Sequence, residues 1–354
     1  MTEKVFLIAT EDNCNDGEVA QRLKDFIVQH ALLDFVKERD MVALKTHFGE
    51  SKGSGYPRPE LVQALGEVVS AKGALPFLTE TSTLYKGDRS NAVEHAILAH
   101  RHGFSFENTG MPIIMADGLL GDEEIEVPVP GELYDKVKIA ALLERVQGMI
   151  LLSHFTGHLA SGFGGALKNL GMGLASRKGK MIQHSTAQPS IRVEKCTRCG
   201  VCLKWCPVSA ISMTEESALI DEAVCIGCGE CLAVCRFDAV GYNWAVTYKD
   251  LQKKIVEHAW GAHRACGGPV LYINVLTRIS KDCDCITSYE KIVPDIGILI
   301  STDPVAIDAA SLALIEERSG KKLADLAYNI PYMTQIDHAK RIGFGSTDFE
   351  VVSV

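Results

Sequence analysis

Eight of the twelve cysteines lie in two runs that share one spacing. The first run, CTRCGVCLKWCP, carries Cys196, Cys199, Cys202 and Cys206, and the second, CIGCGECLAVCR, carries Cys225, Cys228, Cys231 and Cys235. Both runs read C-x2-C-x2-C-x3-C. Three thiolates two residues apart can hold one face of an iron–sulfur cubane, while the fourth points away and reaches a second cluster. The spacing therefore predicts two neighbouring iron–sulfur clusters.

Structural zinc sites are the main alternative, because C-x2-C pairs form those as well. In a zinc site, the two cysteine pairs are usually separated by a longer loop. In each run here, only two residues precede the third cysteine and only three precede the fourth. The spacing therefore favours iron–sulfur clusters. Clusters with a purely structural role are a second alternative, although two close clusters more naturally conduct electrons.

The segment from about residue 191 to residue 244 resembles a bacterial two-cluster ferredoxin domain. The resemblance implies two [4Fe-4S] clusters that exchange their fourth ligands. One cluster would be held by Cys196, Cys199, Cys202 and Cys235, and the other by Cys225, Cys228, Cys231 and Cys206. Arg236 stands where a second proline is usual in that family.

The chain on both sides of this segment alternates strand-like apolar runs with helical periodicity. Strands are predicted at 4–10, 40–48, 74–80, 146–154 and 268–277, and helices at 17–33, 58–73, 91–103 and 248–260. Residues 295–320 predict a strand, a turn capped by Thr302 or Asp303, and a helix. The acidic segment 121–133 is predicted to be a surface loop. We expect an α/β fold, with a mostly parallel sheet flanked by helices and a small ferredoxin-like α+β insert.

The domain organisation follows from where this alternation stops and resumes. We predict one α/β domain formed by residues 1–188 and 246–354, interrupted by a two-cluster ferredoxin domain at 189–245. Three domains in linear order are the alternative.

A candidate site outside the clusters comes from three polar stretches that follow apparent strands, where open α/β sheets tend to bind ligands. They are LKTHFGE with Lys45, His47 and Glu50, a glycine-rich stretch with His154, His158 and Lys168, and MIQH with His184. These stretches, with DCDC and STDPVAIDAASLALI, resemble the family catalogued as domain of unknown function 362, which has no assigned reaction. The segment from His158 through GFGGALKN is also similar to the glycine-lysine loop of nickel-pincer lactate racemases, where a histidine binds the metal and a lysine carries the cofactor.

Each of these residues also has a structural interpretation. Gly162, Gly164 and Gly165 are compatible with a simple tight turn, and no phosphate-loop or dinucleotide-binding motif is present. His47, His154 and His158 are candidates for metal or proton chemistry, and Lys168 for anion stabilisation or imine formation. A core or surface role is preferred for the histidines at positions 95, 100, 102, 258 and 338.

The stretch KDCDC contains Cys283 and Cys285, which belong to neither cysteine run. In an extended segment the two cysteines would share one face, and Asp282 and Asp284 the other, so either pair could supply two ligands to an additional metal ion or cluster. The alternatives are a surface loop with two incidental cysteines, or a dithiol that oxidises, although a disulfide between residues i and i+2 is strained. Cys266 is a further candidate ligand, and Cys14 is predicted to be idle.

Composition limits the remaining function classes. The net charge of −9 argues against nucleic-acid binding, and no apolar run approaches the roughly 18 residues of a membrane span. Without an export signal, a cytoplasmic location is expected.

Two hypotheses for the function remain. The first is a redox enzyme, or enzyme component, that passes low-potential electrons from the clusters to a small-molecule substrate or bound metal in the α/β domain. The second is a non-catalytic electron carrier whose α/β domain docks a partner oxidoreductase. A redox partner protein or ferredoxin is expected in both cases.

Overall fold

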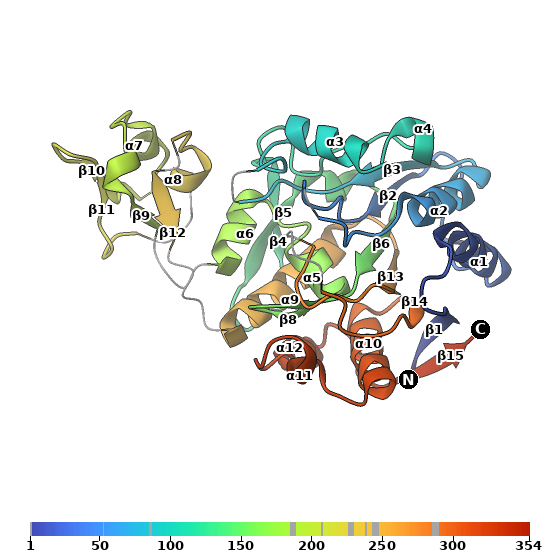
Figure 1. The fold of residues 1–354 in the computed structure, drawn as a ribbon. Helices are drawn as coiled ribbons and strands as arrows, with labels where there is room; N and C mark the ends of the chain where they lie inside the picture. The colour runs from blue at the N-terminus through green and yellow to red at the C-terminus, as the bar shows by residue number, and fades with distance from the viewer. Residues whose placement is uncertain are drawn as a thin grey trace.

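The structure is a computed structural model that describes residues 2–51, 53–84, 87–184, 189–206, 208–225, 230–237, 239–242, 248–284 and 290–354. Its centre is a seven-stranded sheet with the order β15-β1-β14-β13-β6-β2-β3 (Figure 1). The strands are β1 (Glu3–Ala9), β2 (Met41–Lys45), β3 (Leu75–Thr79), β6 (Gly148–His154), β13 (Val270–Leu276), β14 (Gly297–Ser301) and β15 (Phe349–Ser353).

Most neighbouring strands of this sheet run parallel. Within the described residues, β3, β2, β6 and β13 are mutually parallel, as are β1 and β15, while β14 is antiparallel to both β1 and β13. β6, β13 and β14 are buried along their whole length, as expected for strands covered on both faces. The predicted α/β fold with a mostly parallel sheet is confirmed.

Helices cover the sheet on both faces and create two hydrophobic cores. One face packs against α1 (Asp16–Gln29) and α2 (Pro59–Ala71), and the other against α5 (Ala166–Gly171), α9 (Tyr248–Ala265), α10 (Pro304–Ser319) and α12 (Thr334–Ile342). Outside the cysteine-rich segment, the described residues also form α3 (Ala92–Arg101), α4 (Phe106–Thr109), α6 (Arg177–His184), α11 (Leu323–Leu326) and a 3-10 turn at Ala141–Arg145.

Local capping explains where several helices begin. The Asn15 side chain accepts hydrogen bonds from the first backbone N–H groups of α1, and Asp303 does the same for α10, where Pro304 occupies the first turn. Of the two predicted caps for α10, Asp303 is therefore the one used. Gly320, with φ 67°, ends that helix in the left-handed conformation that glycine adopts without strain.

Two parts of the chain differ from the sequence-based expectation. The segment 121–133 was expected to be a loop, but it contains β4 (Glu124–Pro128), which pairs antiparallel with β5 (Lys136–Ala140). Alternate burial of Val127 and Val129 against the core outweighs the acidic composition of this segment. His184 was expected after a strand, but it is the last residue of helix α6.

The cysteine-rich segment forms a small lobe with its own core, beside the main sheet (Figure 1). It contains β9 (Pro189–Ile191), a 3-10 turn (Val193–Lys195), α7 (Val201–Trp205), β10 (Ile211–Met213), β11 (Ala218–Ile220), α8 (Glu230–Ala233) and β12 (Val240–Tyr242). β9 and β12 pair antiparallel and bring the two ends of the segment together. The sheet of the main body takes strands from both before and after this lobe.

Candidate functional site

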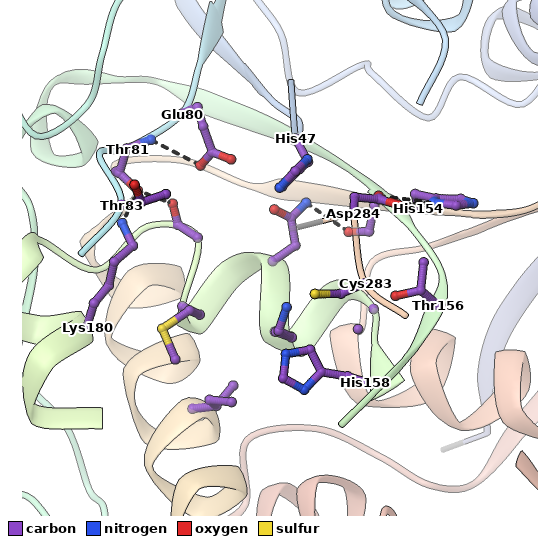
Figure 2. A pocket seen from close by; sticks show the side chains of 18 of the residues that line it. His47, Glu80, Thr81, Thr83, His154, Thr156, His158, Lys180, Cys283 and Asp284 are labelled. Carbon is purple, nitrogen blue, oxygen red and sulfur yellow. Dashed lines mark hydrogen bonds and ion pairs between the residues drawn. The ribbon is translucent and has the colours of Figure 1, made fainter. Parts of the chain in front are cut away.

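A cavity of about 330 Å³ lies at the carboxyl ends of β2, β3 and β6, the edge at which open α/β sheets bind ligands. The segments after these strands line it, together with α5, α6, α9, the short hairpin of β7 (Thr156–His158) and β8 (Gly162–Gly164), and residues 283–284. Figure 2 shows the side chains of His47, Glu80, His158 and Lys180 around this space.

The structure brings together the candidate residues from three distant stretches of sequence. His47, His154, His158, Lys168 and His184 all line the cavity, and so does Cys283. The five histidines for which a core or surface role was preferred are not among its lining residues in the described part of the chain. A common location does not test the chemical role of any candidate, so those roles stay predictions.

A buried ion pair joins the lining residue Glu80, at the end of β3, to Lys45, which ends β2 and lies behind the lining. Lys45 Nζ lies 2.8 Å from Glu80 Oε1 and donates to Asn169 Oδ1 at 2.7 Å. Burial lowers the pKa of Lys45. Burial alone would raise the pKa of Glu80, but the positive charge of Lys45 and its neighbours lowers that pKa to about 2. The two groups are within ion-pair distance, so each offsets the cost of burying the other.

His154 is held as an imidazolium beside the cavity. Its Nδ1 lies 2.9 Å from Asp284 Oδ1 and its Nε2 lies 3.0 Å from the carbonyl oxygen of Thr277. Since a carbonyl and a carboxylate only accept hydrogen bonds, both ring nitrogens carry protons. Burial opposes the charge on this ring, but the charge of Asp284 and its hydrogen bond raise the His154 pKa.

The pair between His154 and Asp284 gives a testable stability prediction. Asp284→Asn is expected to lower the free energy of unfolding by about 2–3 kcal/mol, because a buried imidazolium loses its counter-charge. A raised histidine pKa means that this stabilisation is present below the usual histidine pKa of 6.5 and is lost as the pH rises through the higher pKa of the folded state. Denaturant titrations should therefore show the largest difference between wild type and variant below pH 6.5.

The control for this prediction is Asp34→Asn, which breaks the exposed pair of Asp34 with Lys72. That change should cost less than about 1 kcal/mol. Equal losses in Asp284→Asn and Asp34→Asn would show that the His154 pair is not a buried ionic contact.

His47 and Arg89 form a second group on the wall of the cavity. Gly49 donates its backbone N–H to His47 Nδ1 at 2.9 Å, and Arg89 Nη1 lies 2.9 Å from His47 Nε2. Arg89 is oriented from behind by Glu50, whose Oε1 accepts from the arginine Nε at 2.5 Å. Glu50 therefore positions a cation rather than lining the cavity itself.

The glycine-rich turn before α5 is held by a remote aspartate. Asp308 of α10 accepts hydrogen bonds from the backbone N–H groups of Ala166 and Leu167 at 2.8 and 2.9 Å. A Cβ atom at Gly165 would lie 2.4 Å from Asp308 Oδ1, so glycine is required for this close approach. The turn fixes the start of the helix that presents Lys168 to the cavity.

Lys180 lines the cavity but was not among the candidates from the sequence. It lies in α6, and its Nζ donates to Thr81 Oγ1 and to the carbonyl oxygens of Ser82 and Ala175 at 2.8 and 3.0 Å. Burial lowers the pKa of this lysine to about 8, against the opposing charge of Asp117. No local motif marks Lys180, because two of its three partners, Thr81 and Ser82, lie 99 and 98 residues earlier in the chain.

Residues 282–284 of the KDCDC segment do not have the alternating geometry that an extended strand would give. Cys283 and Asp284 are neighbours, yet both line the cavity, while Asp282 accepts a hydrogen bond from the hydroxyl of Tyr328. The two aspartates therefore have different partners, because a turn replaces the expected extended backbone. Cys285 lies outside the described residues, so a metal role for Cys283 and Cys285 stays a prediction.

The cysteine lobe contains a second, smaller cavity. Cys196, Cys199 and Cys202 of the first run line it together with Cys235 of the second run. Backbone N–H groups point at three of the sulfur atoms, from Ala218 to Cys196, from Ala210 to Cys206 and from Ala239 to Cys235, at 3.2–3.4 Å. Such bonds stabilise negative charge on sulfur. Cys228 lies outside the described residues.

In the described ranges, no three or more histidine, cysteine or acidic side chains are arranged to hold a single metal ion. The same part of the chain has no helix long and apolar enough to cross a membrane.

Comparison with known proteins shows the family of this chain and a second similarity that is confined to the cysteine-rich segment. The family described as "Domain of unknown function (DUF362)" matches residues 42–313. Ferredoxin-2 of Chlorobaculum tepidum is 42% identical over 53 residues, which is 13% of this chain and 86% of the ferredoxin. Hydrogenase-4 component A of Escherichia coli is 46% identical over 39 residues, but these cover only 11% of this chain and 19% of that protein. The cysteine lobe is therefore a ferredoxin-like segment.

Among solved structures, the lactate racemase apoprotein from Thermoanaerobacterium thermosaccharolyticum aligns with a TM-score of 0.46 and 10% sequence identity. The alignment covers 90% of this chain and 58% of that one. A likeness at this level does not bear on activity.

Proposed function

Because the chain belongs to the family described as domain of unknown function (DUF362), a description that assigns no reaction, we propose a function from its own residues. We propose a redox enzyme, or an enzyme component, in which the ferredoxin-like segment delivers electrons to a small molecule in the cavity. The observation that carries this proposal is the presence, in one chain, of a ferredoxin-like lobe and a cavity lined by ionisable side chains.

The cysteines of the lobe fit an iron–sulfur cofactor. We assign one [4Fe-4S] cluster to Cys196, Cys199, Cys202 and Cys235, which line one cavity, and a second to Cys206, Cys225, Cys228 and Cys231. When bound, the clusters would supply electrons one at a time. The backbone N–H groups of Ala210, Ala218 and Ala239 would then help to neutralise the negative charge of the cluster and its thiolates.

Helix α6 supports a route between the two sites. It carries Lys180 and His184, which line the cavity, and its backbone comes within 8 Å of α8, the helix that contains Cys231. A single short helix therefore touches both the proposed electron source and the proposed substrate site. Lys180, with its pKa near 8, is a suitable proton source for a substrate that gains electrons.

The alternative is a non-catalytic electron carrier that docks a partner oxidoreductase. One observation favours it: the apolar side chains of Val201, Trp205 and Phe237 on the cysteine lobe are exposed by 37, 53 and 47%. Exposed aromatic side chains are common at protein interfaces. In the enzyme proposal, the same surface receives the redox protein that donates electrons, so it does not by itself separate the two functions.

The enzyme and the carrier can be distinguished by measuring whether a small molecule or a protein accepts electrons from the clusters. The anaerobically purified, cluster-loaded protein is reduced, freed of excess reductant and mixed with either the small-molecule filtrate or the protein fraction of a cell extract. Cluster reoxidation is followed by visible absorbance. For an enzyme, we expect a component of the filtrate to reoxidise the clusters, and Met172→Trp, which fills the cavity, to slow this reaction about tenfold or more.

Met333→Trp is the matched control, because Met333 is exposed by 40% and lies outside the cavity lining. Reoxidation by the protein fraction alone, at equal rates in wild type and Met172→Trp, would contradict the enzyme proposal and support the carrier.

A further inference from the structure

The cysteines of the lobe differ in their access to solvent. Among the cysteines of the two runs that the structure describes, Cys199 is the exposed one, whereas Cys231 of α8 is buried. Cys199 borders the small cavity of the lobe, and α8 packs beside α6, which lines the large cavity. Figure 1 shows α8 nearer to α6 than α7 is. The lobe therefore has one end open to solvent and another end beside the proposed substrate site.

An apolar surface adjoins the end that is open to solvent. Helix α7 begins two residues after Cys199, and Val201 and Trp205 lie four residues apart on this helix, so they share one face. Phe237 borders the same small cavity as Val201 and Cys199. All three apolar side chains are exposed, and a cluster of exposed apolar side chains marks a site of interaction with another molecule.

Three cations lie among these apolar side chains. Lys204 follows Val201 by three residues and therefore lies on the same face of α7. Arg198 borders the small cavity, and Arg236 is next to Phe237 in the chain. All three cations are exposed. Together with the apolar side chains they form the α7 surface, which consists of Arg198, Val201, Lys204, Trp205, Arg236 and Phe237.

The charge of the α7 surface is opposite to that of the whole chain. Within residues 196–206 and 231–237, every charged side chain is positive, while the acidic residues of the lobe flank these segments or lie in and just after the β10–β11 hairpin. The chain as a whole has a net charge of −9. A negatively charged partner therefore meets net repulsion from the whole molecule and attraction at the α7 surface, and this contrast fixes its orientation.

We propose that the α7 surface docks a small, negatively charged electron-carrier protein, which passes one electron to the cluster assigned to Cys196, Cys199, Cys202 and Cys235. The carrier loses one electron and the cluster gains it, with no bond made or broken. This inference rests on the proposed function, because it names the kind of partner that supplies the electrons. Electron-transfer complexes bury small interfaces, below about 1,200 Å² in total, which suits a surface of this size.

The first test measures electron transfer from reduced flavodoxin, a negatively charged one-electron carrier, to the oxidised, cluster-loaded protein by stopped-flow absorbance. At low ionic strength, the observed rate should rise with flavodoxin concentration and saturate. Lys204→Glu should lower the second-order rate constant about tenfold, and added sodium chloride should reduce this difference because it screens exposed charges. Trp205→Ala should raise the flavodoxin concentration at half-saturation about tenfold, at low and high salt alike, because an apolar contact is lost.

Matched variants and a second reductant are the controls. Lys321→Glu makes the same charge change between α10 and α11, and Phe106→Ala removes an exposed aromatic side chain from α4, so neither should change the kinetics. All four substituted side chains are exposed, so the variants should fold. Methyl viologen radical, a small cation that needs no docking surface, should reduce wild type and every variant at similar rates.

Two results of these kinetics would overturn the inference. One is that flavodoxin reduces Lys204→Glu and Trp205→Ala with the same concentration dependence as wild type. The other is that flavodoxin fails to reduce wild-type protein whose clusters are reduced by methyl viologen radical.

The second test locates the complex without electron transfer. Oxidised flavodoxin and the oxidised, cluster-loaded protein are joined with a carbodiimide, which couples a lysine amine to a carboxylate as an amide and takes up the water released. Peptide mapping should find flavodoxin joined within residues 195–206, the segment that contains Lys204. Links confined to lysines elsewhere in the chain would overturn the docking surface.

The outcomes also separate this inference from the proposed function. Reduction by flavodoxin through the α7 surface, without reoxidation by the small-molecule filtrate, contradicts the enzyme proposal and leaves the docking surface standing. Reoxidation by the filtrate, in a protein that flavodoxin does not reduce, contradicts the docking surface alone.

Discussion

Cys235→Ser is expected to remove one of the two proposed clusters and to lower the iron and acid-labile sulfide content from about eight atoms of each to about four. The reason is that Cys235 lines the same cavity as Cys196, Cys199 and Cys202, although it lies more than thirty residues later in the chain. A serine hydroxyl is a poor substitute for a thiolate toward iron. Anaerobic metal and sulfide analysis, with electron paramagnetic resonance of the reduced protein, measures the loss.

Comparison of four variants tests how the two runs share their ligands. Cys199→Ser should abolish the same resonance signal as Cys235→Ser, whereas Cys206→Ser should abolish the same signal as Cys225→Ser. Cys14→Ser is the control, because Cys14 belongs to neither run and packs against the core beside α1. If Cys235→Ser and Cys225→Ser instead remove the same signal, each run holds its own cluster and the exchange of fourth ligands is wrong.

Glu80→Gln is expected to lower the free energy of unfolding at neutral pH by about 3–5 kcal/mol. The side chain of Lys45 is fully buried and that of Glu80 is 5% exposed, so the variant leaves an ammonium group without its counter-charge. Removing both charges in Lys45→Met/Glu80→Gln should restore part of the loss, because an uncharged pair avoids the cost of burying an unpaired ion. Urea unfolding followed by circular dichroism measures all three proteins.

The pH dependence gives the same pair a second test. The pKa of Glu80 is lowered from 4.5 to about 2, so its stabilisation is present above pH 4.5 and is lost as the pH falls toward 2. The difference between wild type and Glu80→Gln should therefore shrink over that interval. Glu67→Gln, which breaks an exposed pair with Lys24, is the matched control and should cost less than about 1 kcal/mol. A loss in Glu80→Gln no larger than in this control would contradict a buried ionic contact.

Much of the secondary structure could be predicted because its signals are local. The apolar runs of β2, β6, β13 and β14, and the cap of α10 at Asp303, depend on residues within a few positions of one another. The strand β4 was missed because its burial depends on pairing with β5 and on contact with the core, not on its own acidic composition. Local composition does not report such contacts.

The candidate site was predicted only in part, because some of its residues are marked by local signals and others are not. Polar residues after strand ends correctly indicated that His47, His154, His158 and Lys168 would lie around one cavity, since parallel strands bring their carboxyl ends together. Lys180 was missed because it lies within a helix and no neighbouring residue marks it. The alternating faces expected for residues 282–284 are not observed, because that expectation assumed an extended backbone.

The ferredoxin-like segment and the mostly parallel sheet could be predicted from the sequence, because the cysteine spacing and the alternation of strands and helices are patterns of residues close together in the chain. The charged partners depend on the folded chain instead. Glu80 neutralises Lys45 from the end of another strand, and Asp284 meets His154 across 130 positions of sequence. These pairs depend on which buried groups share a space from which water is excluded, and that is a property of the packed sheet and its helices rather than of any short segment.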